Sequence, residues 1–134
     1  MSATTRLLTG LAVAAAVAVP ALPAQAALPL PPGVTDLGVG RPCPPRLLCI
    51  YRDYDWQGPA YGIEPGRHVD LNLLPMAGSG GPTAANNVSS WVNRSFRVAH
   101  LLDHDGPRIQ PLFPGQDLEE LDENNDTVDF VLWP

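Results

Sequence analysis

The chain contains no lysine, and positive charge is scarce throughout. Once an N-terminal stretch carrying Arg6 is set aside, 7 arginines face 14 acidic residues, a formal charge of −7. A chain with so few cations does not bind nucleic acid through a basic, phosphate-facing patch. By charge alone, a cationic surface or a metal ion is the better partner.

Motifs of common enzyme classes are also missing. There is no Gly-x-Ser-x-Gly elbow, no H-E-x-x-H helix and no phosphate-cradling glycine loop. Asp53 and Asp55 are too close in sequence to lie on opposite sides of a sugar. In "HLLDHDG", residues 100–106, we interpret the histidines and aspartates as exposed polar residues near a turn. We therefore expect a protein that is not an enzyme and has no catalytic residue.

Long apolar runs are confined to the N-terminus. Residues 1–26 combine a short basic start, an apolar stretch closed by two prolines, and the small-residue sequence Ala24-Gln25-Ala26. This order is typical of a cleaved secretory signal. A membrane anchor is the alternative, but a spanning helix needs about 20 apolar residues and this run is shorter. We predict a secreted protein of 108 residues, without a membrane segment once the signal is removed.

Cysteine is limited to Cys43 and Cys49, in "CPPRLLCIY". Export places both in an oxidising compartment, so we predict a structural disulfide. The pair is not a C-x-x-C redox motif. It has no nearby histidine with which to form a zinc site.

An internal repeat organises the rest of the chain. "GPAYGIEPGRHVDL", residues 58–71, aligns with "GPRIQPLFPGQDLEEL", residues 106–121, and an Asn-Asn pair follows in each copy. Alternating or β-rich runs between turn residues predict eight strands. They are expected at 47–54, 60–64, 67–71, 89–93, 96–102, 108–113, 116–121 and 127–132.

Four strands repeated twice predict an all-β sandwich of two Greek keys. We place the first Greek key at about 43–93 and the second at about 94–134. Residues 27–42 are expected to be a Pro/Gly-rich, extended leader. We expect a monomer.

The first copy resembles a βγ-crystallin-like domain. Tyr51 and Gly58 form its aromatic-x6-Gly hairpin, and "ANNVSSW" places Ser89 and Ser90 where that family has its Ser/Thr-Ser pair. More narrowly, "CPPRLLCIYRDYDWQG" followed by "NNVSSWVN" is similar to the secreted, actinobacterial SMPI-like peptidase inhibitor family. The second copy follows the pattern loosely.

This resemblance implies that the protein binds and blocks an extracellular proteinase, mainly a metalloproteinase, by presenting a stiff loop. The inhibitor that typifies the family holds its reactive loop with a second disulfide. This chain has no cysteine after Cys49, so no reactive residue is assigned. An alternative is a calcium-stabilised structural or killer-toxin-like binding module of the same fold.

Calcium is the one cofactor that the resemblance implies. The two arches of a βγ-crystallin domain offer oxygen ligands, which suit a hard cation. The candidates are Asn86, Asn87 and Ser89 in one arch and Glu123, Asn124, Asn125 and Thr127 in the other. Turns satisfied by their own amide hydrogen bonds are the alternative.

The loop "LLPMAGSGGPT", residues 73–83, is present in only one copy. We expect it to protrude, with Leu74 and Met76 as apolar anchors for a partner. An insertion without a role is the alternative.

Overall fold

The computed structural model describes residues 28–134, so the predicted signal lies outside the described residues. Within that part the chain forms eleven strands and one 3-10 turn. Their bounds are β1 Val34–Val39, β2 Leu48–Asp53, β3 Gln57–Ile63, β4 Val69–Asp70, η1 Leu71–Leu73, β5 Pro75–Gly78, β6 Gly81–Thr83, β7 Ser90–Asn93, β8 Ala99–Leu102, β9 Ile109–Leu112, β10 Asp117–Glu119 and β11 Phe130–Leu132. Among the described residues, no helix has the length and apolar character needed to cross a membrane.

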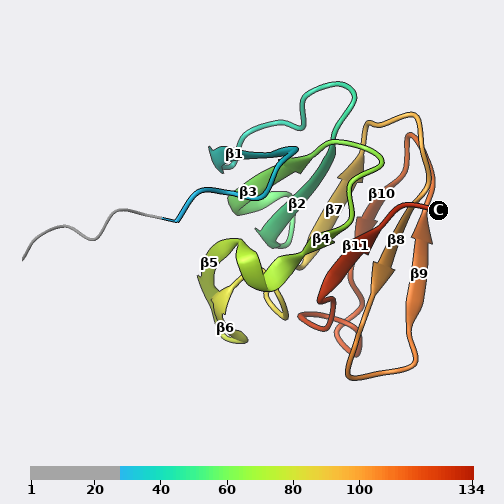
Figure 1. Cartoon of the computed structure of the whole chain (residues 1–134). Helices are drawn as coiled ribbons and strands as arrows, with labels where there is room; N and C mark the ends of the chain where they lie inside the picture. The colour runs from blue at the N-terminus through green and yellow to red at the C-terminus, as the bar shows by residue number, and fades with distance from the viewer. Residues whose placement is uncertain (1–27) are drawn as a thin grey trace, which may run out of the picture.

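Two antiparallel sheets pack face to face (Figure 1). One has the order β1-β3-β2-β7-β10 and the other β4-β11-β8-β9, while β5 and β6 form a separate hairpin. Each half of the chain lends one strand to the sheet of the other half. β4 pairs with β11 of the second half, and β10 pairs with β7 of the first. This is the predicted all-β sandwich of two four-stranded Greek keys, and the fold class is confirmed.

Each of the eight predicted strands coincides with a strand of the sandwich, and one further strand extends the first sheet. Residues 34–39, which we expected in an extended leader, form β1 and pair with β3 from Val34↔Ile63 to Val39↔Pro59. For these residues the leader interpretation is wrong, because their backbone groups join the sheet. The sequence gives a weak signal here, since three glycines interrupt the apolar residues between 33 and 40.

β2 is buried on both faces. Leu48 and Ile50 point into the core between the sheets, where Ile50 lies opposite Trp91 of β7. Cys49 and Tyr51 point to the outer face and pack with Ala60 and Val92. Leu37 of β1, Cys43 and Leu47 cover this second cluster. The β1 strand and the disulfide loop therefore shield an outer apolar cluster from solvent.

The β2–β3 hairpin depends on one glycine. Gly58 has φ +75°, and a Cβ atom there would lie 2.4 Å from a carboxylate oxygen of Asp53. Asp55 and Trp56 also have positive φ in the turn itself. A side chain at residue 58 would meet both a steric clash and an unfavourable backbone conformation.

Candidate functional site

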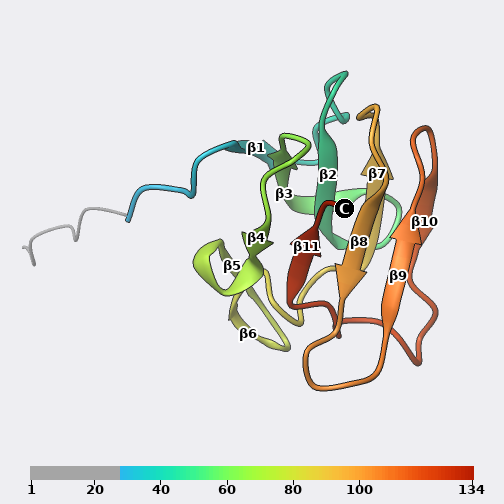
Figure 2. The same ribbon diagram turned by 45° about the vertical axis from the view of Figure 1, so that its right-hand side comes forward.

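The connections between strands gather at two ends of the sandwich, and the two ends differ in charge. One end, here named the basic end, comprises residues 42–47, 64–68, 94–98 and 113–116 and contains four arginines and one carboxylate, Glu64. The other, the acidic end, comprises residues 54–56, 103–108 and 120–129 and contains eight carboxylates and one arginine. In Figures 1 and 2 the basic end is at the top, and the β8–β9 and β10–β11 connections of the acidic end are at the bottom.

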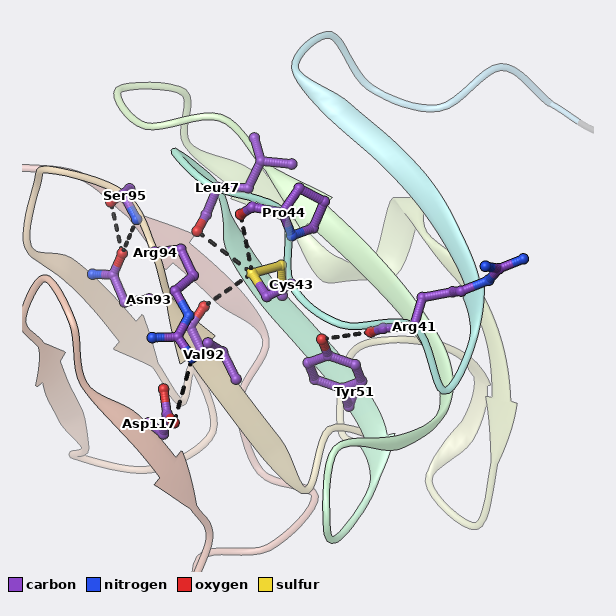
Figure 3. The surroundings of a disulfide bond; sticks show 11 residues. Arg41, Cys43, Pro44, Leu47, Tyr51, Val92, Asn93, Arg94, Ser95 and Asp117 are labelled. Carbon is purple, nitrogen blue, oxygen red and sulfur yellow. Dashed lines mark hydrogen bonds and ion pairs between the residues drawn. A yellow bond between two sulfur atoms is a disulfide. The ribbon is translucent and has the colours of Figure 1, made fainter.

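The disulfide between Cys43 and Cys49 closes the first loop of the basic end, and this prediction is confirmed (Figure 3). Two prolines follow Cys43, and the exposed Arg46 adopts φ +70° at the tip. The loop also shares backbone hydrogen bonds with its neighbour. Arg46 N–H donates to Arg94 O at 3.0 Å, and Arg94 N–H donates to Leu47 O at 2.9 Å. Ring closure, proline and these bonds together fix the loop before any partner arrives.

Tyr51 makes a hydrogen bond to the segment that leads into the disulfide loop. Its hydroxyl donates to the carbonyl oxygen of Arg41 at 2.8 Å. Burial raises the pKa of this hydroxyl, while the Arg94 charge lowers it and the Asp117 charge raises it. The tyrosine stays protonated and keeps its hydrogen bond over the range in which proteins are usually studied.

Asn93 joins two connections of the basic end, residues 94–98 and 113–116. Its buried amide nitrogen donates to Arg97 O at 2.9 Å and to Leu112 O at 2.8 Å. Its amide oxygen accepts from the backbone N–H of Ser95 at 3.0 Å and from the hydroxyl at 2.7 Å. Gly115 N–H donates to its backbone carbonyl at 2.7 Å. The sequence analysis missed this residue, because a single asparagine ending a strand carries no distinctive signal.

The basic end exposes large side chains on this fixed backbone. Phe96 is 73% exposed and Phe113 is 51% exposed. Arg94 makes one long ion pair with Asp117 at 3.9 Å, and Arg97 donates to the carbonyl oxygen of Pro134. Among the described residues, the Arg46 guanidinium makes no ion pair. Aromatic and arginine side chains therefore face solvent together.

The acidic end is held by a buried ion pair. Arg108 donates to Glu120 at 2.7 Å, with side chains only 18% and 1% exposed. The second carboxylate oxygen of Glu120 accepts from the indole N–H of Trp91 at 2.9 Å. Asp103 caps the turn, since its carboxylate accepts from the N–H groups of Asp105 and Gly106. The β8–β9 hairpin is thus anchored to the core through one carboxylate.

The two predicted arches meet at the acidic end, and their asparagines have different roles. Asn86 has φ +59°, and its amide donates to Asp129 at 3.1 Å. Asn87 is buried, accepts from Gly80 N–H at 2.8 Å and donates to carbonyl oxygens within residues 76–83. The Asn87 amide is thereby committed to holding the β5–β6 hairpin, which matches the turn alternative at this position.

A polar cavity of about 220 Å³ lies where the arches cross. Among its lining residues are Asp53, Ser79, Ser89 and Asp126. The hydroxyls of Ser79 and Ser89 lie 3.4 and 3.5 Å from the Asp126 carboxylate. Burial raises the pKa of Asp126, the two hydroxyls lower it, and the Asp53 charge raises it. Asp126 was absent from the predicted ligands, because the family pattern leaves its position free.

The remaining predicted ligands lie in the second arch. Thr127 donates its hydroxyl to Asn124 O at 2.9 Å, and the amide nitrogen of Asn125 donates to Asp126 at 3.1 Å. Glu123 is exposed, and the buried amide oxygen of Asn125 has no hydrogen-bond partner. In the described part of the chain, no group of three or more His, Cys, Asp or Glu residues converges as a metal site.

Leu74 and Met76 do not serve as anchors for a partner, and this prediction is wrong. Both side chains are buried in the core between the sheets. The 73–83 segment folds back as η1, β5 and β6, and Ala84 N–H donates to Leu74 O at 2.8 Å. The two side chains remove apolar area from water within the molecule, which explains why they are large and apolar in a Gly-rich loop.

The comparisons with known proteins agree with this geometry. Residues 40–105 match the model of peptidase inhibitor family I36. The chain belongs to this family. A solved structure described as "Evolution of the eye lens beta-gamma-crystallin domain fold" matches with a TM-score of 0.56 and 17% identity, over 75% of this chain and 96% of that one. At that identity the likeness shows the fold alone. No curated protein matches the chain.

The I36 segment takes in most of the basic end. It contains the disulfide loop and the 94–98 connection, and it ends inside the β8–β9 hairpin. It also contains Tyr51, Gly58 and the first arch with Ser89 and Ser90. Ser90 accepts from Trp56 N–H at 3.2 Å and donates to Asp53 O at 2.6 Å, so it ties the β2–β3 hairpin to β7.

Proposed function

We propose that the protein is a secreted inhibitor of an extracellular proteinase. The observation that carries this proposal is the match of residues 40–105 to peptidase inhibitor family I36. Membership of an inhibitor family also supports a role without enzymatic activity. The partner is then a proteinase.

The rigidity of the connections supports the proposal physically. A proteinase binds an extended or tightly turned backbone, and ordering a mobile loop on binding costs free energy. Here the protein itself orders the disulfide loop and the β8–β9 hairpin. The first is held by Cys43–Cys49 and by backbone hydrogen bonds to Arg94, and the second by the Arg108–Glu120 ion pair. Such loops lose little entropy when a partner binds them.

The disulfide supports the proposed location. A disulfide that closes a small loop persists in an oxidising compartment and is rare in a reducing one. Together with the predicted signal over residues 1–26, it supports secretion into the medium where extracellular proteinases act.

Inhibition assays test the proposal directly. The purified protein, expressed without residues 1–26, is titrated against a thermolysin-like metalloproteinase and a subtilisin-like serine proteinase. We expect the metalloproteinase to lose activity in proportion to added protein, with a stoichiometric end point at nanomolar enzyme. The same protein, reduced and alkylated in denaturant, is the control and should leave the rate unchanged. No inhibition of either enzyme at micromolar protein would contradict the proposal.

Calcium binding at the crossed arches stays a prediction. Asp126 with the hydroxyls of Ser79 and Ser89 supports it, because these oxygens suit a hard cation. The Asn87 amide is already occupied, and Arg52 forms a two-pronged ion pair with Asp53, which leaves fewer ligands than we expected. Calcium should raise the melting temperature and EDTA lower it. An unchanged melting curve would end this prediction.

A further inference from the structure

The charge of this protein is divided unevenly. The chain as a whole is acidic, yet the connections of the basic end contain four arginines and one carboxylate. Such a separation makes one end of the molecule electrostatically attractive to an acidic surface, while the opposite end repels it.

The same end also combines the residue types that dominate binding energy at protein interfaces. Arginine and aromatic side chains are enriched at binding hot spots. Phe96 and Phe113 are both well exposed, and their neighbours Arg97 and Leu112 are joined through the Asn93 amide. The two phenylalanines therefore extend from adjacent points of a fixed backbone. Exposed phenylalanine gains little in a protein that acts alone, since its ring stays in water.

We propose that the basic end, through Arg46, Arg94, Arg97, Phe96 and Phe113, is the surface with which this inhibitor contacts its proteinase, and that the contacted surface of the proteinase is acidic with an apolar recess. This inference rests on the proposed function and assigns the surface through which the proteinase is bound. Charge complementarity identifies the occupant. A proteinase whose cleft is bordered by carboxylates attracts this end and repels the acidic one.

The disulfide loop is the part of this surface best suited to enter a cleft. Arg46 is at the tip of a convex loop with its guanidinium free of ion pairs within the described chain. Its backbone is held by the hydrogen bond to Arg94 O and by the ring that Cys43 and Cys49 close. A charged tip on a stiff loop binds with little loss of entropy.

The position of the family match favours this end over the opposite one. Residues 40–105 include Arg46, Arg94, Phe96 and Arg97. The match stops at Asp105, so it leaves out half of the β8–β9 hairpin and the whole β10–β11 connection. The inhibitor-family segment thus covers the basic end more completely than the acidic end.

Two variants of the whole mature chain test the surface. The triple variant Arg46→Asn, Arg94→Gln, Arg97→Gln removes three positive charges, and asparagine tolerates the left-handed backbone at residue 46. The double variant Phe96→Ala, Phe113→Ala removes the exposed rings. Two exposed side chains away from the basic end provide matched controls. Ile109→Ala, in β9, is the control for the loss of apolar area, and Asp105→Asn, at the acidic end, is the control for the loss of charge. Melting temperatures within a few degrees of wild type show that each variant folds.

The inhibition constant of each variant is measured against the proteinase that the wild-type protein inhibits. We expect each basic-end variant to weaken inhibition by about 30-fold or more, and each control to change it less than about threefold. Raising the salt concentration should slow wild-type association by at least about tenfold and affect the triple variant much less.

The possible outcomes separate the two proposals. If the wild type inhibits and the basic-end variants inhibit equally well, the basic end is not the contact surface and the proposed function stands. If the control at residue 105 or 109 weakens inhibition more than the basic-end variants do, the contact surface is the acidic end. If the wild type inhibits neither proteinase, the proposed function fails and this inference fails with it.

Discussion

The two ends of the sandwich are made rigid by different chemistry. At the basic end a covalent bond between Cys43 and Cys49 closes the disulfide loop, and the neutral amide of Asn93 joins the 94–98 connection to the end of β9. At the acidic end the Arg108–Glu120 ion pair anchors the β8–β9 hairpin, and the Asn87 amide anchors the β5–β6 hairpin. Each end therefore uses one buried asparagine, and they differ in whether a disulfide or an ion pair completes the support.

This difference matters for the conditions under which each end stays ordered. A disulfide persists at any ordinary pH and is lost to a reductant. An ion pair is indifferent to reductant, but removal of one partner leaves the other charge buried and unpaired. The acidic end should thus be the more sensitive to single substitutions, and the basic end the more sensitive to reduction.

The largest effect is expected from Glu120→Ala. The substitution leaves the Arg108 guanidinium buried without its partner and the Trp91 indole N–H without its acceptor. We expect a loss of about 3–5 kcal/mol in the free energy of unfolding, measured by urea denaturation. Glu123→Ala removes an exposed carboxylate of the same connection and should have little effect. Equal stability of the two variants would contradict the anchoring role of Glu120.

The second prediction concerns the two buried asparagines. Asn93→Ala and Asn87→Ala each leave buried carbonyl and N–H groups unsatisfied, so each should cost roughly 2–3 kcal/mol. Asn72→Ala, at an exposed position, should change stability by less than about 0.5 kcal/mol. Hydrogen exchange should accelerate at 94–98 and 113–116 in the first variant and at 76–83 in the second. Faster exchange at both ends in one variant would show that the ends are not independent.

Much of the sandwich is predictable because its strands follow a strong local pattern. The period-2 runs and the Pro-Gly and Asn-Asn turns place all eight strands of the two Greek keys. The exchange of β4 and β10 between sheets is a property of the repeated fold and follows from the family resemblance. β1 escapes prediction because its glycines weaken the alternation, and pairing with β3 is what fixes it.

The candidate site is harder to predict because it depends on contacts between distant residues. Nothing near Glu120 in the sequence indicates that its carboxylate reaches both Arg108 and Trp91. Leu74 and Met76 looked like exposed anchors because the loop around them is rich in glycine and serine. Their burial depends on how the hairpin folds back onto the core, which local composition does not determine.

Removing the disulfide is the third prediction. In the variant Cys43→Ala, Cys49→Ala the short loop is no longer closed in the unfolded chain, which costs about 2 kcal/mol. Denaturation with and without dithiothreitol measures this. Reductant should bring the wild type down to the stability of the double variant and leave the variant unchanged. If reductant lowers the stability of both proteins equally, the disulfide is not what supports this end.

The smallest effect is expected from substitution of Asp126, which should raise the stability of the protein rather than lower it. Burial and the nearby Asp53 charge raise its pKa in the folded protein above the ordinary value of 3.8. The folded state therefore binds the proton more tightly than the unfolded state. The resulting stabilisation is fully present below pH 3.8 and is lost as the pH rises through the raised pKa. At neutral pH the ionised carboxylate is a cost to the fold.

Asp126→Asn removes that cost and keeps an oxygen to accept from the hydroxyls of Ser79 and Ser89. In EDTA at pH 7 the variant should melt roughly 1–4 °C above wild type, and this advantage should vanish at pH 3.5, where the wild-type carboxyl is protonated too. In excess calcium the wild type should melt above the variant if the crossed arches bind the ion, because only the wild type offers a charged ligand at residue 126. A variant that melts below wild type in EDTA at pH 7 would show that the Asp126 carboxylate stabilises the acidic end. The polar cavity would then have to be reinterpreted as a satisfied hydrogen-bond network rather than as a place where negative charge is held at a cost.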